Sequence, residues 1–186
     1  MKKIIAFIAA LMLLLPLTNA QKIFTREANV SFHSDAPLEK IEAHNKKGTS
    51  VIDTESGRME FAVLIKAFQF EKALMQEHFN ENYMESSKYP KAVFKGAIAD
   101  LKAINFSKDG TYDTTVKGTM TIHGVSKEIE ATGKVKVVNG VISTESELEI
   151  LPADYDIEIP AVVRDNIAKV ITVTIKAQYQ TLGSKK

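Results

Sequence analysis

Apolar and polar residues alternate at every second position through most of this chain, and this pattern constrains the fold more than any other feature. A period of two is typical of a β-strand that buries one face and exposes the other. Short runs with tight turns between them indicate antiparallel pairing with one solvated face. We expect about eight strands, at residues 28–32, 40–53, 58–70, 91–101, 112–123, 128–137, 142–150 and 171–179.

Two glycine dipeptides, Asp109-Gly110 and Asn139-Gly140, are expected to form hairpin turns, because both accept positive φ at low cost. Eight antiparallel strands remove their exposed edges by closing into a barrel, so the predicted class is an all-β, eight-stranded antiparallel barrel. A barrel of this size either fills with side chains or holds one small ligand. Small residues at inward positions fit both alternatives: they leave volume open, or they ease strand curvature while phenylalanines fill the space. These small residues are Gly96, Gly118, Ala131, Gly133 and Ala177.

The connection between Phe68 and Gly96 is too apolar to be an ordinary hairpin loop, which is short and polar. Residues 71–79 have helical spacing, and their apolar face covers more than half of the helix circumference. Tyr89-Pro90 ends this segment, since the residue before proline is pushed out of the α region. We therefore expect a short helical insertion between two strands, lying over or into the mouth of the barrel.

Three sequence elements resemble those of a known family, the YceI-like, polyisoprenoid-binding periplasmic proteins. Residues 87–94 (SKYPKAVF) are similar to the family's YP-x-x-x-F element, and residues 120–127 (MTIHGVSK) resemble its LTIHGVTK corner. Residues 151–156 (LPADYD) occupy the position of its R-x-D-F/Y-G element, with Pro152 and Asp156 in place of the arginine and the glycine. The family's paired phenylalanines are replaced by Tyr83-Met84. The resemblance extends over essentially all of the chain after the leader.

This resemblance implies a lipocalin-like barrel whose interior holds a long isoprenoid chain, such as a quinone or a polyprenyl lipid, and no other cofactor. Such a ligand needs an apolar tunnel rather than a set of polar groups. We expect the tunnel wall to include Phe61, Val63, Ile65, Phe94, Ile98, Val116, Met120 and Ile122. We expect Phe68, Phe70, Leu74, Phe79 and Tyr83 near its mouth. His78 is the candidate for contact with a polar head group.

Catalytic motifs are missing from the sequence. It has no GxSxG elbow, no HExxH pair, no glycine-rich phosphate loop and no cysteine, and its four histidines lack metal-ligand spacing. We therefore expect a non-enzymatic lipid-binding protein without a metal site. One alternative is a filled barrel that acts as an envelope stress or interaction protein through its outer surface. An enzyme for a hydrophobic substrate is a third hypothesis, with Tyr112, Thr114 and His78 as its only candidate polar groups.

The first 20 residues have the composition of a secretory signal peptide. Lys2 and Lys3 precede an apolar run of about fourteen residues, shorter than the roughly 20 that a membrane-spanning helix needs, and Thr18-Asn19-Ala20 resembles a cleavage site. We expect cleavage after Ala20, one domain over residues 21–186, and a periplasmic or secreted protein without a stable membrane span; an uncleaved amphipathic anchor is the alternative. Without Lys2 and Lys3, 22 basic residues face 23 acidic ones, and this charge of −1 argues against a nucleic-acid partner.

Overall fold

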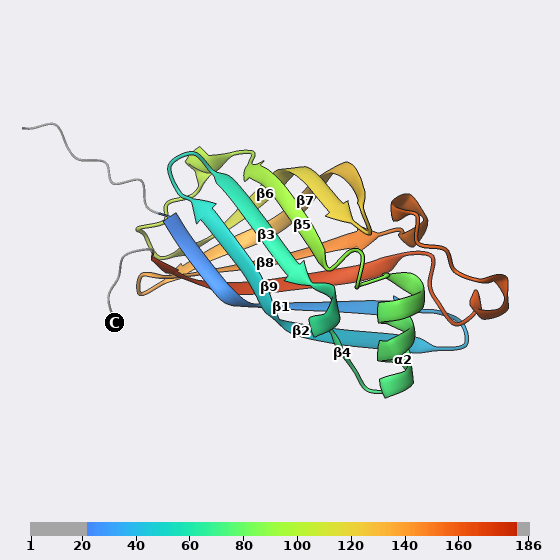
Figure 1. Cartoon of the computed structure of the whole chain (residues 1–186). Coiled ribbons are helices and arrows are strands. Elements are labelled where there is room, and N and C mark those ends of the chain that lie inside the picture. Colours follow the sequence, from blue (N-terminus) through green and yellow to red (C-terminus); the bar gives the residue numbers. More distant parts are fainter. Residues whose placement is uncertain (1–21, 182–186) are drawn as a thin grey trace, which may run out of the picture.

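The computed structural model of the chain describes residues 22–181 and is dominated by long antiparallel strands (Figure 1). The strands are β1 (Lys22–Asp35), β2 (Lys40–Asp53), β3 (Arg58–Leu64), β4 (Gln69–Phe70), β5 (Lys91–Ile98), β6 (Gly110–Ile122), β7 (Val125–Val138), β8 (Val141–Ile150) and β9 (Ile171–Thr181). The helical elements are η2 (Ile65–Ala67), α2 (Ala73–His78), the π-helical η3 (Phe79–Tyr83), η4 (Leu101–Ala103), η5 (Pro152–Tyr155) and η6 (Ala161–Val163). The expected signal peptide lies outside the described residues.

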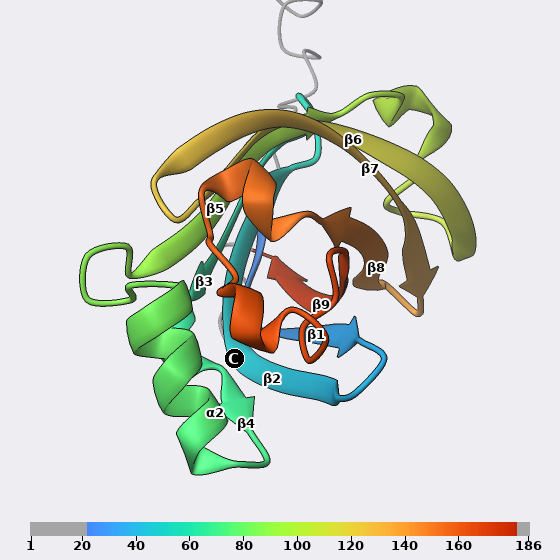
Figure 2. The same cartoon turned by 90° about the vertical axis from the view of Figure 1, so that its right-hand side faces the viewer.

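Eight of these strands close into a barrel. Their order is β1-β9-β8-β7-β6-β5-β3-β2, and β1 also pairs with β2, which closes the ring. Every pairing is antiparallel. The two-residue β4 pairs with β2 beside the ring, and Figure 2 shows the barrel from the end at which α2 lies. The predicted eight-stranded antiparallel barrel with a short helical insertion is therefore confirmed. Within residues 22–181, no helix is long and apolar enough to cross a membrane.

The strand expected at 58–70 is wrong beyond Leu64, where β3 ends and the single turn η2 begins. Ile65 and Phe68 are three residues apart, so a continuous strand would point them to opposite faces. The helical turn instead buries both of them, at 3% and 5% exposure. The chain then pairs briefly with β2, placing Phe70 opposite Ala43.

Tight turns connect some of the strands. Asn139-Gly140 is the predicted hairpin turn, with φ values of 51° and 76°, and His123-Gly124 forms a second one with 51° and 80°. The turn expected at Asp109-Gly110 is wrong, because Gly110 begins β6 and residues 99–109 form a longer loop. The Asp109 carboxylate instead accepts hydrogen bonds from the backbone N–H of Asn139, at 3.0 and 3.1 Å, and holds the neighbouring turn.

One end of the barrel is filled with side chains. At the start of β1, the end of β2 and the β7–β8 hairpin, inward residues are almost completely buried, among them Ile23, Ile52, Val135 and Val137. Tyr179 lies in the same layer and donates a hydrogen bond from its hydroxyl to Ser50 Oγ at 3.0 Å. This packing supplies the barrel with a compact core at the end opposite α2.

Two of the small inward residues allow close strand approach rather than opening volume. Gly96 on β5 lies opposite Gly118 on β6. A Cβ at Gly118 would collide with the Lys95 carbonyl oxygen and with the Gly96 Cα, and a Cβ at Gly96 would lie 2.6 Å from the Phe94 ring. Here, therefore, the phenylalanine takes up the space that the glycines leave.

Candidate functional site

The end of the barrel nearest α2 contains an apolar cavity of about 320 Å³. This volume lies at the lower end of the range of roughly 300 to 1,000 Å³ that is typical of ligand pockets. Seven barrel strands contribute to its wall, almost entirely from their inner faces. Their contributions are Val30, Phe32, Ser34, Ile41, Phe61, Val63, Ala92, Val93, Phe94, Met120, Ile122, Leu148, Ile150, Ile171, Val173 and Ile175.

Several of these aliphatic residues face inward and yet keep accessible surface. Leu148, Val173 and Ile175 line the cavity and are only half-buried. Val135 and Val137, at the filled end, are 2% and 1% exposed. The difference arises because Leu148, Val173 and Ile175 border the open volume of the cavity, whereas Val135 and Val137 lie in the filled layer. An apolar occupant would remove this surface from water, which is favourable by roughly 25 cal/mol per Å².

Most residues expected in the tunnel lie on this cavity. The residues from the sequence prediction that line it are Phe61, Val63, Ile65, Phe68, Phe70, His78, Phe79, Tyr83, Phe94, Met120 and Ile122. Three expected residues do not line it. Leu74 is 62% exposed on α2, while Ile98 and Val116 are paired across β5 and β6 and pack against the filled core.

The sequence prediction noted residues 151–156 as a family-like element but placed no site residue on the loop between β8 and β9, which runs across the end of the barrel (orange to red in Figure 2). This loop carries apolar residues that line the cavity. They are Pro152, Ile157, Ile159, Val163 and Ile167. Pro152 belongs to the family-like element at residues 151–156, and beyond it the sequence signal is the alternation of Ile157 and Ile159 between polar neighbours, which is too short to indicate an element.

The helical insertion forms one side of the cavity. Its π-helical turn carries Phe79, whose ring centroid lies 5.5 Å from that of Phe32, 5.7 Å from that of Phe68 and 5.0 Å from that of Phe70. All four rings also line the cavity. The expected position of the insertion over the mouth is thus partly corrected: the insertion walls one side, and the β8–β9 loop runs across the end.

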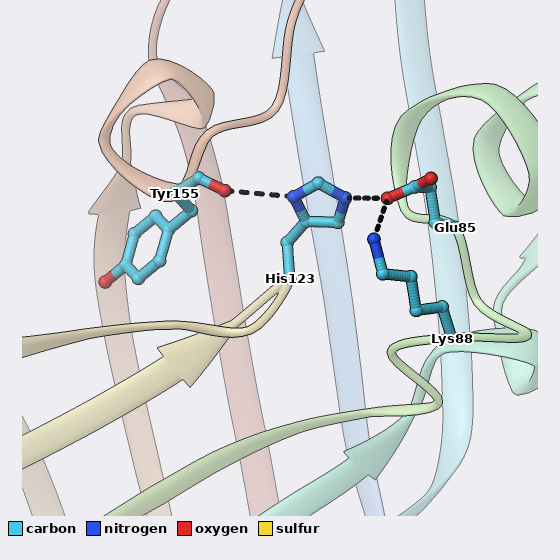
Figure 3. Close-up of polar contacts among 4 residues, drawn as sticks. All are labelled: Glu85, Lys88, His123 and Tyr155. Carbon is cyan, nitrogen blue, oxygen red and sulfur yellow. Dashed lines mark hydrogen bonds and ion pairs between the residues drawn. The ribbon is translucent and has the colours of Figure 1, made fainter.

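His123 connects three segments beside the cavity (Figure 3). Its Nδ1 lies 3.1 Å from the carbonyl oxygen of Tyr155 in the β8–β9 loop, and its Nε2 lies 3.1 Å from Oε2 of Glu85 at the end of the insertion. Lys88 Nζ is 3.6 Å from the same carboxylate oxygen. A carbonyl and an ionised carboxylate both accept hydrogen bonds, so each of the two contacts needs an N–H on the ring nitrogen that faces it. The His123 side chain is only 11% exposed.

Aromatic packing reinforces this junction. The Tyr89 ring lies edge-on to the His123 ring, with centroids 4.6 Å apart. A Cβ on the neighbouring Gly124 would lie 2.6 Å from the Tyr89 ring. Tyr155 is buried, and burial raises the pKa of its hydroxyl. The end of the insertion, the β6–β7 turn and the β8–β9 loop therefore pack as one unit.

Glu39 forms a second junction, on the loop between β1 and β2. Lys72 Nζ, at the start of α2, lies 3.2 Å from Glu39 Oε1, and Asn166 Nδ2, in the β8–β9 loop, donates to Oε2 at 3.3 Å. These two hydrogen bonds hold the pKa of Glu39 below its ordinary value, and the bond from Lys72 has the larger effect. Glu39, Asn166 and His78 all line the cavity, and His78 is exposed. The cavity reaches solvent here, and we call these three residues the mouth.

The polar groups named by the enzyme hypothesis do not come together at the cavity. Tyr112 and Thr114, which the enzyme hypothesis would need beside His78, do not line the cavity. The Tyr112 hydroxyl instead donates to the Lys108 carbonyl oxygen at 2.9 Å. Among the described residues, no group of three or more His, Cys, Asp or Glu side chains could hold a metal ion. What the site can do is enclose an apolar molecule.

The closed ring of eight strands and its one-ended apolar cavity define a lipocalin-like barrel. The family comparison is more specific: the model of the YceI-like domain matches residues 22–179, and the chain belongs to this family. No curated protein sequence matches the chain.

Solved structures share the fold. A polyisoprenoid-binding domain from Saccharophagus degradans, implicated in plant cell wall breakdown, is 16% identical, with a TM-score of 0.75 over 88% of this chain and 99% of that one. Burkholderia cenocepacia BcnA is 16% identical, with a TM-score of 0.67 over 82% and 96% of the two chains. The Campylobacter jejuni YceI protein is 17% identical, with a TM-score of 0.59 over 76% and 85%. At these identities the likeness concerns the fold alone.

Proposed function

We propose that this chain is an exported, non-enzymatic binding protein that holds a long apolar lipid, a polyisoprenoid or an isoprenoid quinone, in the barrel cavity. The observation that carries the proposal is the uncovered aliphatic wall formed by residues such as Leu148, Val173 and Ile175. The description of a structural relative as a polyisoprenoid-binding domain supports the choice of ligand class. The signal-like leader supports export.

The chemistry of the cavity suits an isoprenoid tail. Such a tail is uncharged along its length, and each buried methylene contributes about 0.8 kcal/mol before the costs of association are subtracted. Met75, Met84 and Met120 line the cavity, and flexible thioether side chains adapt to an irregular chain. Because the volume is at the lower end of the ligand-pocket range, we expect the polar end of a long lipid to lie at the mouth, beside His78.

The filled-barrel alternative predicted an interior without a cavity. The cavity of about 320 Å³ contradicts that expectation, although the opposite end of the barrel is filled. A role confined to the outer surface would not explain why the aliphatic wall is uncovered. The lipid-binding function is therefore favoured.

Native mass spectrometry of protein purified from its own host tests the proposal directly, together with the melting temperature in the presence of ubiquinone-10 or a polyprenol. We expect a lipid-sized mass to co-purify and the added lipids to raise the melting temperature, because a ligand that binds only the folded state stabilises it. If no lipid co-purifies and neither addition changes the melting temperature, the proposal is wrong.

A matched pair of variants links this binding to the cavity. Leu148 and Val173 face each other across β8 and β9 on the cavity wall, so Leu148→Phe/Val173→Phe should occupy the cavity and abolish the lipid-induced increase in melting temperature. Val138 and Val141 form an equivalent cross-strand pair on the outer surface, each 44% exposed. The control Val138→Phe/Val141→Phe should keep the increase. Equal responses from the two variants would place the lipid elsewhere.

A further inference from the structure

The three most exposed large hydrophobic residues among residues 22–181 stand well apart from the others. Val162 is 88% exposed, Leu38 is 73% exposed and Leu74 is 62% exposed, whereas no other large hydrophobic residue in this part of the chain exceeds 44%. Single exposed apolar residues are common on protein surfaces and need no explanation. The position of these three residues is what distinguishes them.

Each of the three directly adjoins a residue that lines the cavity: Leu38 precedes Glu39, Leu74 precedes Met75 and Val162 precedes Val163. They come from three segments at the same end of the barrel, the β1–β2 loop, α2 and the β8–β9 loop (Figure 2). We call Leu38, Leu74 and Val162 the rim.

Polar contacts hold the rim segments together. Glu39 binds Lys72 from the α2 segment and Asn166 from the β8–β9 loop. The Leu38 backbone N–H also donates to the carbonyl oxygen of Asp165, at 3.1 Å. The three apolar side chains are therefore presented on one connected frame rather than on independent loops.

The charge of the rim segments shows which kind of surface fits them. Residues 35–40, 71–78 and 160–170 carry five acidic and four basic side chains. This balance gives no excess of positive charge with which to attract an anionic membrane, which usually takes a cluster of Lys and Arg residues. The interaction that the rim offers to a membrane is therefore apolar contact. Elements with an apolar face bind lipid surfaces by burying that face at the boundary between head groups and acyl chains.

We propose that the rim docks onto the surface of a neutral lipid bilayer and that lipid passes from the bilayer through the mouth into the cavity. This inference rests on the proposed lipid-binding function, because the mouth is the route by which an apolar ligand enters. A lipid released into water would expose its whole tail, whereas transfer across a docked rim keeps the tail covered. The docking is a surface contact and needs no membrane-spanning element.

Flotation of the protein with phosphatidylcholine vesicles tests the docking without reference to any ligand. We expect the triple variant Leu38→Ser/Leu74→Ser/Val162→Ser to lower the vesicle-bound fraction at least tenfold. The control Val51→Ser/Val138→Ser/Val141→Ser replaces three residues that are each 44% exposed and lie away from the mouth, and it should bind like the unaltered protein. Equal flotation of the two variants would overturn the proposal.

Two further measurements distinguish docking onto a neutral bilayer from binding to an anionic membrane and from self-association. Addition of phosphatidylglycerol to the vesicles or a change in salt concentration should leave binding within twofold, and strong salt dependence would contradict apolar docking. Sedimentation velocity of the unaltered protein and the triple variant should give the same oligomeric state. A dimer that the triple variant abolishes would assign the rim to self-association and overturn the proposal.

A transfer assay distinguishes a failure of docking from a failure of lipid binding. The probe is farnesol carrying a fluorescent anthraniloyl group, offered either in detergent or in phosphatidylcholine vesicles. The triple variant should bind the detergent-solubilised probe normally but take it up from vesicles at least tenfold more slowly. Normal uptake from vesicles would overturn the docking proposal alone. Failure of the unaltered protein to bind the probe even in detergent would count against the proposed function instead.

Discussion

His123 Nε2 lies 3.1 Å from Glu85 Oε2, and this contact joins residues that are 38 positions apart in the sequence. Both residues have positive φ, 51° for His123 and 41° for Glu85. Non-glycine residues adopt this conformation at a cost and persist in it when the surrounding structure holds them there. The side-chain pair therefore stabilises two strained backbone positions where the insertion meets the barrel.

A double-mutant cycle with His123→Asn and Glu85→Gln should give a coupling free energy of about 1 kcal/mol, since a hydrogen bond to a charged group contributes more than a neutral one and His123 is nearly buried. Asparagine is chosen because it tolerates positive φ. Urea unfolding of the four proteins measures the coupling. The control cycle, His33→Asn with Glu42→Gln, concerns a pair 3.6 Å apart with both side chains about half exposed, and it should give less than about 0.5 kcal/mol. Equal couplings would show that the His123 contact has no special role.

Gly118→Ala should destabilise the barrel by about 3 kcal/mol, because a new Cβ would collide with the backbone of the neighbouring strand β5, which cannot move without breaking its pairing. The matched control is Gly140→Ala. Gly140 has a φ of 76° and no atom within 4 Å of an added Cβ, so only backbone strain of about 1 to 2 kcal/mol is expected. Thermal or urea unfolding compares the two. A Gly118→Ala protein as stable as the control would contradict the close approach of β5 and β6.

Tyr179→Phe should cost about 1 to 3 kcal/mol, because it leaves the buried Ser50 hydroxyl without this partner. Tyr112→Phe removes an exposed tyrosine hydrogen bond, to the Lys108 carbonyl, and should cost less than about 0.5 kcal/mol. Urea unfolding measures both. A cost for Tyr179→Phe no larger than that for Tyr112→Phe would be inconsistent with the buried pair.

Burial raises the pKa of Tyr179, so this residue also predicts a pH dependence. The folded state keeps the phenolic proton at pH values at which the unfolded chain has released it. The associated stability is therefore complete below the unfolded pKa of about 10 and falls as the pH rises above it. Urea unfolding between pH 8 and 11 should show a steeper decline for the unaltered protein than for Tyr179→Phe. Parallel declines would contradict the assignment.

Glu39 predicts a loss of stability as the pH falls, whereas Tyr179 predicts a loss as the pH rises. Its folded pKa is lowered by Lys72 and Asn166, so its contribution to stability is complete above the ordinary glutamate pKa of about 4.3 and is lost as the pH falls through the lower folded value. Glu39→Gln should remove this part of the acid decline, and Lys72→Gln should reduce it. Urea midpoints between pH 2.5 and 6 provide the measurement. A Glu39→Gln profile parallel to that of the unaltered protein would show that the junction does not contribute.

The parts of the fold that depend on local pattern could be predicted. The period of two placed the long strands, and Asn139-Gly140 forms its turn because both residues adopt positive φ. Asp109-Gly110 has the same local preference, yet it forms no tight turn, because the Asp109 carboxylate binds the backbone of Asn139, 30 residues away. Local propensity gives way where a distant partner satisfies the same group.

The cavity, too, could be predicted only in part from the local sequence pattern. Alternation identified which residues face inward, such as Phe61, Phe94 and Met120, but not their level along the barrel axis. Ile98 and Val116 also face inward and lie in the filled core instead, since strand stagger decides which layer meets side chains and which meets open volume. The β8–β9 loop could not be assigned to the cavity because its lining residues follow no period long enough to indicate which of them face inward.

The sequence by itself thus determined the number of long strands, their inward faces and the presence of an apolar insertion, because each of these depends on side chains near one another in the chain. The tertiary structure alone decided that one end of the barrel is filled and the other hollow. It also decided that Glu39 and His123 each tie three segments around the hollow end. The physical reason is that cavities and junctions arise from strand register and from contacts between residues far apart in sequence.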